Sequence, residues 1–219
     1  RPELLGYVDG LHFHTLCEQD AQPLHDTLKE VERQFGEWLP KMKWLNFGGG
    51  HHITREGYDI ALLERCICDM KEKYDLEIFL EPGEAVALNA GVLLTKVEEI
   101  VENSIQIAIL DTSAACHMPD VLEMPYRPPL QDGYEAEEKA YTYRLAGPTC
   151  LAGDVIGDYS FAEPLKRGDT LTFEDMAIYT MVKNNTFNGM RLPAIVLEDK
   201  DGECRVVRQF VYEDFKMRL

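Results

Sequence analysis

Two histidines and a run of three glycines are the first residues whose types and spacing could support chemistry. His12 and His14 lie two apart in an apolar segment, so in a strand they share one face. His12 also suits a packed interior position, whereas the flat ring of His14 at a strand end suits stacking on an aromatic cofactor. Gly48-Gly49-Gly50 follows a second apolar segment, and bare backbone amides approach a phosphate closely. A flexible turn is the structural alternative for the glycines.

A carboxylate follows the third apolar segment. Glu81 opens the sequence Glu81-Pro82-Gly83, where it can pair with a cation held in a site or simply begin a helix. His51 and His52 follow the glycines, and together with the earlier histidines they raise the question of a metal site. No carboxylate or thiol pattern completes a known ligand set, so we expect no metal.

Further candidates lie in the second half of the chain. Cys150 ends the tight sequence Gly147-Pro148-Thr149-Cys150, with Asp154 close behind, and a thiol there is either reactive or a buried structural group. Tyr179 and Phe187-Asn188-Gly189 flank a short polar stretch that we expect to be a loop. Alone, these last residues indicate core aromatics and a turn.

Hydrophobic periodicity predicts alternating strands and helices in the first 88 residues. Apolar residues recur at helical spacing over two segments and form short runs in three others. This alternation indicates βαβ units and a parallel sheet, whose carboxyl-terminal edge collects chemistry. His14, Gly48 to Gly50 and Glu81 are therefore expected on one rim. The predicted helices are 22–35 and 58–74, and the predicted strands are 6–14, 43–47 and 76–80.

After about residue 90 the pattern changes to short strands separated by turn signals. These features predict an all-β half, a sandwich or barrel, so the domain boundary is placed between 1–88 and 89–219. We expect the proline-rich, acidic stretch 119–138 to be an ordered surface loop. The predicted strands are 92–101, 105–110, 141–146, 169–173, 192–197 and 205–212.

Charge and cysteine usage narrow the class of protein. The formal net charge is −17, from 39 acidic and 22 basic side chains. A negative field repels nucleic acid and anionic membranes and attracts a polycationic substrate, although it also serves solubility alone. Six scattered cysteines without a CxxC pair argue against a zinc ribbon or a disulfide framework and fit reduced thiols in the cytoplasm. No apolar run is long enough to cross a bilayer.

Five sequence blocks, taken in order, carry a resemblance to a known family. They are GLHFHTLCE, NFGGGHHIT, EPGE, GPTCLAGD and FEDMAIYTMVKNNTFNGM. The ordered set resembles the fold type III pyridoxal-phosphate-dependent decarboxylases, whose members act on ornithine, arginine, diaminopimelate or carboxynorspermidine. The resemblance implies an α/β plus all-β chain: the second half of a (β/α)8 TIM barrel over 1–88, then a C-terminal β-domain over 89–219.

The resemblance also implies roles for the candidates that would bind pyridoxal 5'-phosphate. His14 would stack on the cofactor ring, and Gly48, Gly49 and Gly50 would present backbone donors to its phosphate. Tyr179 would add a hydroxyl. Glu81 would face the pyridine nitrogen and keep it protonated, which makes the ring an electron sink.

The same resemblance assigns the proton donor to a second subunit. The family works as a homodimer, in which Cys150 would reach the neighbouring site and protonate the carbon that loses carbon dioxide. Asp154 would meet a substrate amine. No nucleic acid or membrane partner is implied.

Two departures from the family pattern resemble the carboxynorspermidine subgroup. Most relatives have Gly-Ser after the stacking histidine, but here the residues are Thr15-Leu16-Cys17. Most also have arginine after Glu-Pro-Gly, but here it is Glu84, which favours a substrate with several ammonium groups. The segment 111–120 matches the region that sets substrate length, so Asp120 is the candidate for a distal amine and Glu84 for a nearer one. The alternative is that both are solvated surface acids.

The resemblance places the cofactor's lysine on an early barrel strand, and no lysine here has the matching context. We therefore expect the chain to be the C-terminal portion of a longer enzyme that decarboxylates carboxynorspermidine, and carboxyspermidine as well. Two alternatives stay open. One is a decarboxylase of a simple amino acid such as ornithine, arginine or diaminopimelate. The other is a non-catalytic relative that binds a regulatory partner.

Overall fold

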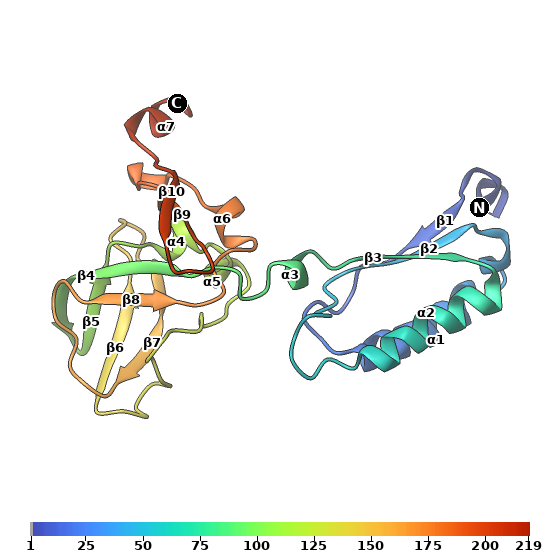
Figure 1. Ribbon diagram of the computed structural model, residues 1–219, viewed down its shortest axis with the longest axis horizontal. Helices are drawn as coiled ribbons and strands as arrows, with labels where there is room; N and C mark the ends of the chain where they lie inside the picture. Colours follow the sequence, from blue (N-terminus) through green and yellow to red (C-terminus); the bar gives the residue numbers. More distant parts are fainter. Residues whose placement is uncertain (1) are drawn as a thin grey trace. The chain divides into compact units, whose positions relative to one another are not determined.

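The computed structural model describes residues 2–219, and the chain divides into two compact units. The first unit ends at Leu88 and the second begins at Asn89 (Figure 1). In the described residues no helix combines the length and the apolar character that crossing a membrane requires.

The first unit is a three-stranded parallel sheet in the order β1-β2-β3, with one helix in each connection. The helices α1 and α2 contact each other and lie on the same side of the strands (Figure 1). The elements are η1 (Pro2–Tyr7), β1 (Gly10–His12), α1 (Ala21–Phe35), η2 (Leu39–Lys41), β2 (Trp44–Gly49), α2 (Ile60–Tyr74), β3 (Glu77–Glu81) and α3 (Gly83–Val86).

Capping side chains fix the helix boundaries of this unit. Asp20 accepts a hydrogen bond from the amide of Ala21 at 2.7 Å, and α1 ends at Phe35, as predicted, with Gly36 as its C-cap. Asp59 accepts from the amide of Leu62 at 2.9 Å and starts α2 two residues later than periodicity suggested. The Asp59 side chain satisfies the third amide of α2, which has no partner inside the helix, and so fixes where this helix starts.

The first strand is shorter than predicted. Residues 2–7 form a 3-10 helix, and Tyr7 is 88% exposed, so the apolar pattern there does not report a buried strand. Pairing starts at Gly10, where a Cβ atom would lie 2.0 Å from the ring of Trp44. The second strand, by contrast, runs on through Gly49.

The second unit contains a five-stranded sheet in the order β7-β6-β5-β4-β8. Neighbouring strands are antiparallel except β5 and β6, which are parallel. A separate antiparallel hairpin joins β9 and β10. The elements are β4 (Leu93–Asn103), β5 (Ile105–Leu110), α4 (Ala114–His117), α5 (Asp120–Glu123), β6 (Tyr141–Ala146), β7 (Val155–Phe161), β8 (Thr170–Phe173), α6 (Thr180–Lys183), η3 (Phe187–Gly189), β9 (Ile195–Glu198), β10 (Cys204–Arg208) and α7 (Tyr212–Lys216).

The strand β7 was missed by the sequence argument because its apolar alternation is interrupted. Gly157 and the half-exposed Asp158 stand in its middle, while Tyr159 is fully buried and donates its hydroxyl proton to the Pro128 carbonyl at 2.7 Å. The predicted last strand is too long, because Asp214 accepts from the Val211 amide at 2.7 Å and the chain turns into α7. The helix α6 stands where a loop was expected. The predicted fold class, an α/β half followed by a mainly β half, is confirmed.

Candidate active-site residues

Polar side chains meet at the carboxyl-terminal edge of the first sheet. Gly49 of β2 pairs with Glu81 of β3, and Asn46 of β2 donates from Nδ2 to Glu81 Oε1 at 2.8 Å. The other oxygen of Glu81 lies 3.7 Å from His12 Nε2. Asn46 Oδ1 also accepts from the amide of Gly48 at 2.8 Å. The structure therefore brings Glu81 and the glycines together, and Asn46, which the sequence argument did not single out, joins them.

The glycine run is required by close approach of neighbouring backbone. Gly48 has φ +73°, and a Cβ there would lie 2.2 Å from the Phe13 carbonyl oxygen. At Gly49 a Cβ would lie 2.8 Å from the Glu81 carbonyl oxygen and 3.0 Å from His14 Cε1. The His14 ring and the Glu81 backbone thus flank one glycine, which leaves bare amide backbone at the rim.

The segment that departs from the family pattern forms a tight turn. Leu16 and Glu18 have φ values of 60° and 64°, which side-chain-bearing residues adopt uncommonly. The Glu18 amide donates to the Gly50 carbonyl at 2.9 Å. The turn places Cys17 Sγ 3.3 Å from His14 Nε2, so a thiol contacts the ring that was predicted to stack on a cofactor.

The two histidines after the glycines are buried. Burial lowers the pKa of His51, whose ring is therefore neutral at pH 7 and donates Nε2–H to the Phe47 carbonyl at 3.1 Å. His52 Nε2 lies 3.2 Å from Glu84 Oε2 as an ion-pair contact, and among the described residues this buried nitrogen forms no hydrogen bond. The Glu84 side chain is only 20% exposed, in the first turn of α3, so it is not a freely solvated surface acid.

The geometry corrects one step of the metal argument. The ligand atoms of His12, His14 and Glu81 all lie within 4.8 Å of one another. Glu81, which was expected on this rim but not counted as a ligand, therefore places a carboxylate beside the two histidines from a strand about 70 residues further along the chain. All three side chains are exposed, and exposed groups of this kind also cluster without a metal.

In the second unit, the structure joins two segments that the sequence treated separately. Cys150 is exposed, and its Sγ donates to Asn188 Oδ1 at 3.3 Å. Asn188 has φ 57° inside the turn Phe187–Gly189, a left-handed conformation that asparagine tolerates better than most residues. The sequence argument treated Asn188 only as part of a turn. In the structure its carboxamide is a hydrogen-bond partner of the Cys150 thiol.

Asp154 is buried rather than turned to solvent. It is 2% exposed, and its carboxylate accepts hydrogen bonds from both sides. The donors are the Ser113 hydroxyl (3.0 Å), the Ala115 amide (3.2 Å), and the Thr149 amide (3.3 Å) and hydroxyl (2.6 Å). A carboxylate held in this way argues against the predicted direct contact of Asp154 with a substrate amine.

Asp120, whose side chain is 21% exposed, and Tyr179 are less deeply buried than Asp154. Asp120 begins α5 and accepts a hydrogen bond from Lys183, which also lies 3.2 Å from Glu123. These carboxylates raise the pKa of Lys183, so Asp120 already has a cationic partner. Tyr179 precedes α6, is 48% exposed and has φ 55°, a strained conformation of the sort that concentrates at functional sites.

Comparison with known proteins decides the family. A family model described as pyridoxal-dependent decarboxylase, C-terminal sheet domain, matches residues 14–177. The chain belongs to the pyridoxal-dependent decarboxylases. The resemblance that the five sequence blocks predicted is confirmed.

Within this decarboxylase family, two curated relatives are each 45% identical to the chain. One is the carboxynorspermidine/carboxyspermidine decarboxylase of Campylobacter jejuni, over 98% of this chain and 59% of the relative. The other is the carboxyaminopropylagmatine decarboxylase of Synechocystis, over 97% of this chain and 55% of the relative. The chain thus spans somewhat more than half the length of these relatives.

A solved structure agrees with these matches. The crystal structure of the Campylobacter jejuni carboxynorspermidine decarboxylase complexed with norspermidine is similar with a TM-score of 0.89 and 46% identity. The match covers 98% of this chain and 62% of that chain. Diaminopimelate decarboxylases are more distant, for example 31% identical over 84% of this chain in Haemophilus influenzae.

The rim of the first sheet fits the cofactor of the decarboxylase family. It offers glycine backbone for a phosphate, the flat ring of His14, and the carboxylate of Glu81, which Asn46 holds by one oxygen. Asn46 is a neutral amide and brings no positive charge beside Glu81, which suits a partner that is cationic only when protonated.

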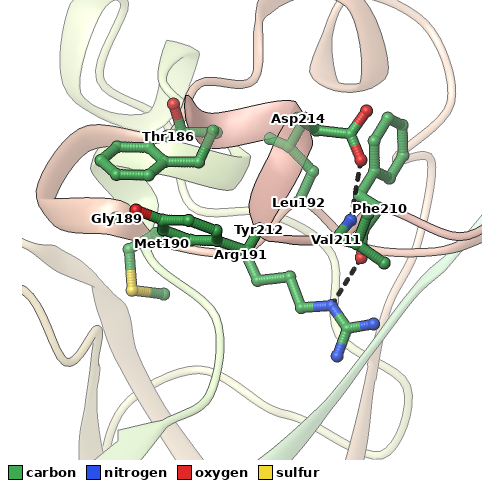
Figure 2. A pocket seen from close by; sticks show the side chains of 10 residues that line it. Thr186, Gly189, Met190, Arg191, Leu192, Phe210, Val211, Tyr212 and Asp214 are labelled. Atoms are coloured by element: carbon green, nitrogen blue, oxygen red, sulfur yellow. Dashed lines mark hydrogen bonds between the residues drawn. The ribbon is translucent and has the colours of Figure 1, made fainter. Parts of the chain in front are cut away.

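A cavity of about 360 Å³ in the second unit is lined by Gly189 of the 187–189 turn, but by none of the residues that were assigned a role with the cofactor or the substrate (Figure 2). Arg191 donates from Nε to the Phe210 carbonyl at 2.9 Å on one wall, and its own carbonyl accepts from His117 Nε2 at 3.0 Å. The cavity is lined by Thr186, Gly189, Met190, Arg191, Leu192, Phe210, Val211, Tyr212, Asp214 and Phe215.

Proposed function

We propose that the protein containing this chain is a pyridoxal-phosphate-dependent carboxy-lyase of polyamine biosynthesis. It removes the α-carboxylate from carboxynorspermidine, and from carboxyspermidine, to give norspermidine or spermidine. The observation that carries the proposal is the close match, in sequence and in fold, to the carboxynorspermidine decarboxylase of Campylobacter jejuni over 98% of the chain. The net charge of −17 supports a polycationic substrate.

In this proposal residues 1–88 provide part of the cofactor site. Pyridoxal phosphate, when bound, supplies an electron sink for the bond that breaks. His14 stacks on the ring, and the amides of Gly49 and Gly50 donate to the phosphate, whereas the Gly48 amide donates to Asn46 and holds the turn in place. Glu81, held by Asn46, keeps a proton on the pyridine nitrogen.

Residues 89–219 complete the site in a homodimer. Tyr179 adds its hydroxyl to the phosphate. Cys150 reaches the site of the partner subunit and protonates the carbon atom from which carbon dioxide has left. The Asn188 carboxamide oxygen accepts a hydrogen bond from Sγ at 3.3 Å and holds the thiol in place.

Two carboxylates are the candidates for the substrate's amines. Glu84 meets a nearer ammonium group and Asp120 a distal one, in exchange for Lys183. Because the Synechocystis relative is equally similar, carboxyaminopropylagmatine, with a guanidinium end in place of an ammonium, is the second candidate substrate.

A product assay on the complete protein tests the proposal. With pyridoxal phosphate present, we expect carboxynorspermidine to be decarboxylated with a kcat/KM at least a hundredfold above those for ornithine, arginine and diaminopimelate, a difference of about 2.7 kcal/mol. Carboxyaminopropylagmatine separates the two polyamine candidates in the same assay. Turnover of a simple amino acid instead would reject the substrate class. A protein with no product and no borohydride-sensitive absorbance band would be the non-catalytic relative.

A further inference from the structure

One buried carboxylate joins two segments of the second unit that the proposed function uses. Asp154 Oδ2 accepts from the amide and the hydroxyl of Thr149, the residue before Cys150. Its Oδ1 accepts from the hydroxyl of Ser113, the N-cap of α4, and from the amide of Ala115 in the first turn of that helix. The Cys150 loop is therefore fastened to the segment that leads toward Asp120.

The burial of Asp154 makes these hydrogen bonds strong and hard to replace. No lysine, arginine or histidine forms an ion pair with it in residues 2–219, although it is only 2% exposed. A buried carboxylate without a cation is tolerated when several donors converge on it. Loss of the negative charge would therefore release both segments together.

Gly147, the first residue of the Cys150 loop, is separate evidence that this loop packs on Asp154. A Cβ atom at Gly147 would lie 2.2 Å from Asp154 Oδ2, and the Gly147 amide donates to the Asp154 carbonyl at 2.8 Å. The loop closes on the carboxylate so tightly that only a residue without a side chain fits. At Gly153, in the same loop, a Cβ would meet nothing within 4 Å.

A second set of hydrogen bonds connects the 113–116 segment to the thiol of Cys150. Asn185 donates from Nδ2 to the Ala115 carbonyl at 2.8 Å, and its amide donates to the Cys116 carbonyl at 2.8 Å. Three residues later Asn188 accepts from Cys150 Sγ. The thiol is thus held from its own loop and from the 185–188 turn, and both are fastened to residues 113–116.

From this arrangement we infer that Asp154 is the positioning residue of the proton donor. It acts through Thr149 and through the 113–115 segment, and it does not touch the substrate. The inference rests on the proposed function for the role of Cys150. It adds that one side chain holds the proton donor and the start of the substrate-length segment in a fixed relation.

The test compares Asp154→Asn with Asp158→Asn in the complete protein. Asp158 is a matched control because it pairs with Arg144 at 2.8 and 2.9 Å and its side chain is 41% exposed. Hydrogen exchange is measured on peptides that contain Thr149 and Ala115, with peptides of β4 and β5 as the check that the unit stays folded. Iodoacetamide labelling of Cys150 is followed by mass spectrometry, with the exposed Cys17, Cys68 and Cys204 as internal references.

We expect Asp154→Asn to speed exchange in both loop peptides and to raise Cys150 labelling about fivefold or more, while β4 and β5 stay protected. In the decarboxylation assay kcat should fall about tenfold or more with KM changed less than about threefold, because a misplacement of about 1 Å is enough for such a loss. Asp158→Asn should change none of these. A fall in kcat with both loops and Cys150 unmoved would overturn the inference and return Asp154 to a direct substrate contact.

If Asp154→Asn unfolds the protein, a second pair of variants tests the inference that Asp154 positions Cys150. Gly147→Ala pushes on the carboxylate and should raise Cys150 labelling, whereas Gly153→Ala should not. Equal labelling in the two would overturn the inference. The exchange and labelling results do not depend on turnover, so a wild-type protein that lacks decarboxylase activity would refute the proposed function and leave the positioning result standing.

Discussion

Replacing Gly49 by alanine tests the proposed cofactor site at its centre. Unlike Gly48 and Gly50, Gly49 does not have a positive φ, so alanine there is not strained by its backbone conformation. The whole effect of the substitution comes from the added methyl group. That group would point at the Glu81 carbonyl oxygen and at the ring of His14.

The expected magnitude follows from the distances. The new Cβ would lie 2.8 Å from the Glu81 oxygen and 3.0 Å from His14 Cε1, whereas ordinary contact begins at 3.4 Å. The end of β3 and the ring must therefore withdraw by about 0.6 and 0.4 Å. Overpacking of this kind costs about 1–3 kcal/mol. If it is expressed in cofactor affinity, the dissociation constant rises about 5- to 150-fold.

The assay is a spectroscopic titration of the complete apoprotein with pyridoxal phosphate, accompanied by urea unfolding. Gly83→Ala is the control, because it adds the same methyl group two residues after Glu81, where a Cβ would meet nothing within 4 Å. It should bind the cofactor as the wild type does. A Gly49→Ala protein that binds the cofactor within twofold of the Gly83→Ala protein would refute the placement of the cofactor on this rim.

Two further predictions concern the second unit. Cys150→Ala in the complete enzyme should slow turnover by about 100-fold or more or misplace the proton in the product, and unchanged kinetics and products would exclude its role as proton donor. Burial lowers the pKa of His117, whose Nδ1 accepts from the Thr112 hydroxyl at 2.8 Å, so the folded unit holds this ring neutral. Because the unfolded chain takes up the proton first, stability should fall as the pH drops below about 6.5, by at most about 1.4 kcal/mol per pH unit from this group. Urea unfolding of the wild type and of His117→Gln from pH 7 to pH 5 measures the effect, and parallel curves would contradict it.

The elements that the sequence predicted well are those that local residues determine. The predicted helix 22–35 matches α1 to within one residue, because its apolar periodicity and the following Gly36 are local features of the sequence. Errors arose where a distant contact overrides the local pattern. Tyr7 belongs to an apolar run, yet it is exposed because pairing starts only at Gly10. Likewise β7 carries Asp158 in mid-strand because Arg144 of the neighbouring strand pairs with it.

In the candidate site, too, the sequence identified residues by local signals and missed the contacts between distant residues. Residue types and order were enough to select His14, the glycines and Glu81. The residues that hold the candidates in place were not predictable, because they act across 35 positions between Asn46 and Glu81 and across 38 between Cys150 and Asn188. For Asp154 the deciding fact was burial, which no local pattern reports.

The side chains that hold two of the proposed site residues in place carry no charge. Asn46 holds Glu81 and Asn188 holds Cys150, and both are neutral amides that fix a side chain without taking its charge or its proton. A lysine in place of Asn46 would neutralise the carboxylate that a protonated ring needs. Asp120 differs from these residues, because its hydrogen-bond partner is the positively charged side chain of Lys183. An ion pair with a lysine that is 38% exposed is screened by water, so a substrate carrying several ammonium groups can displace Lys183 at little cost.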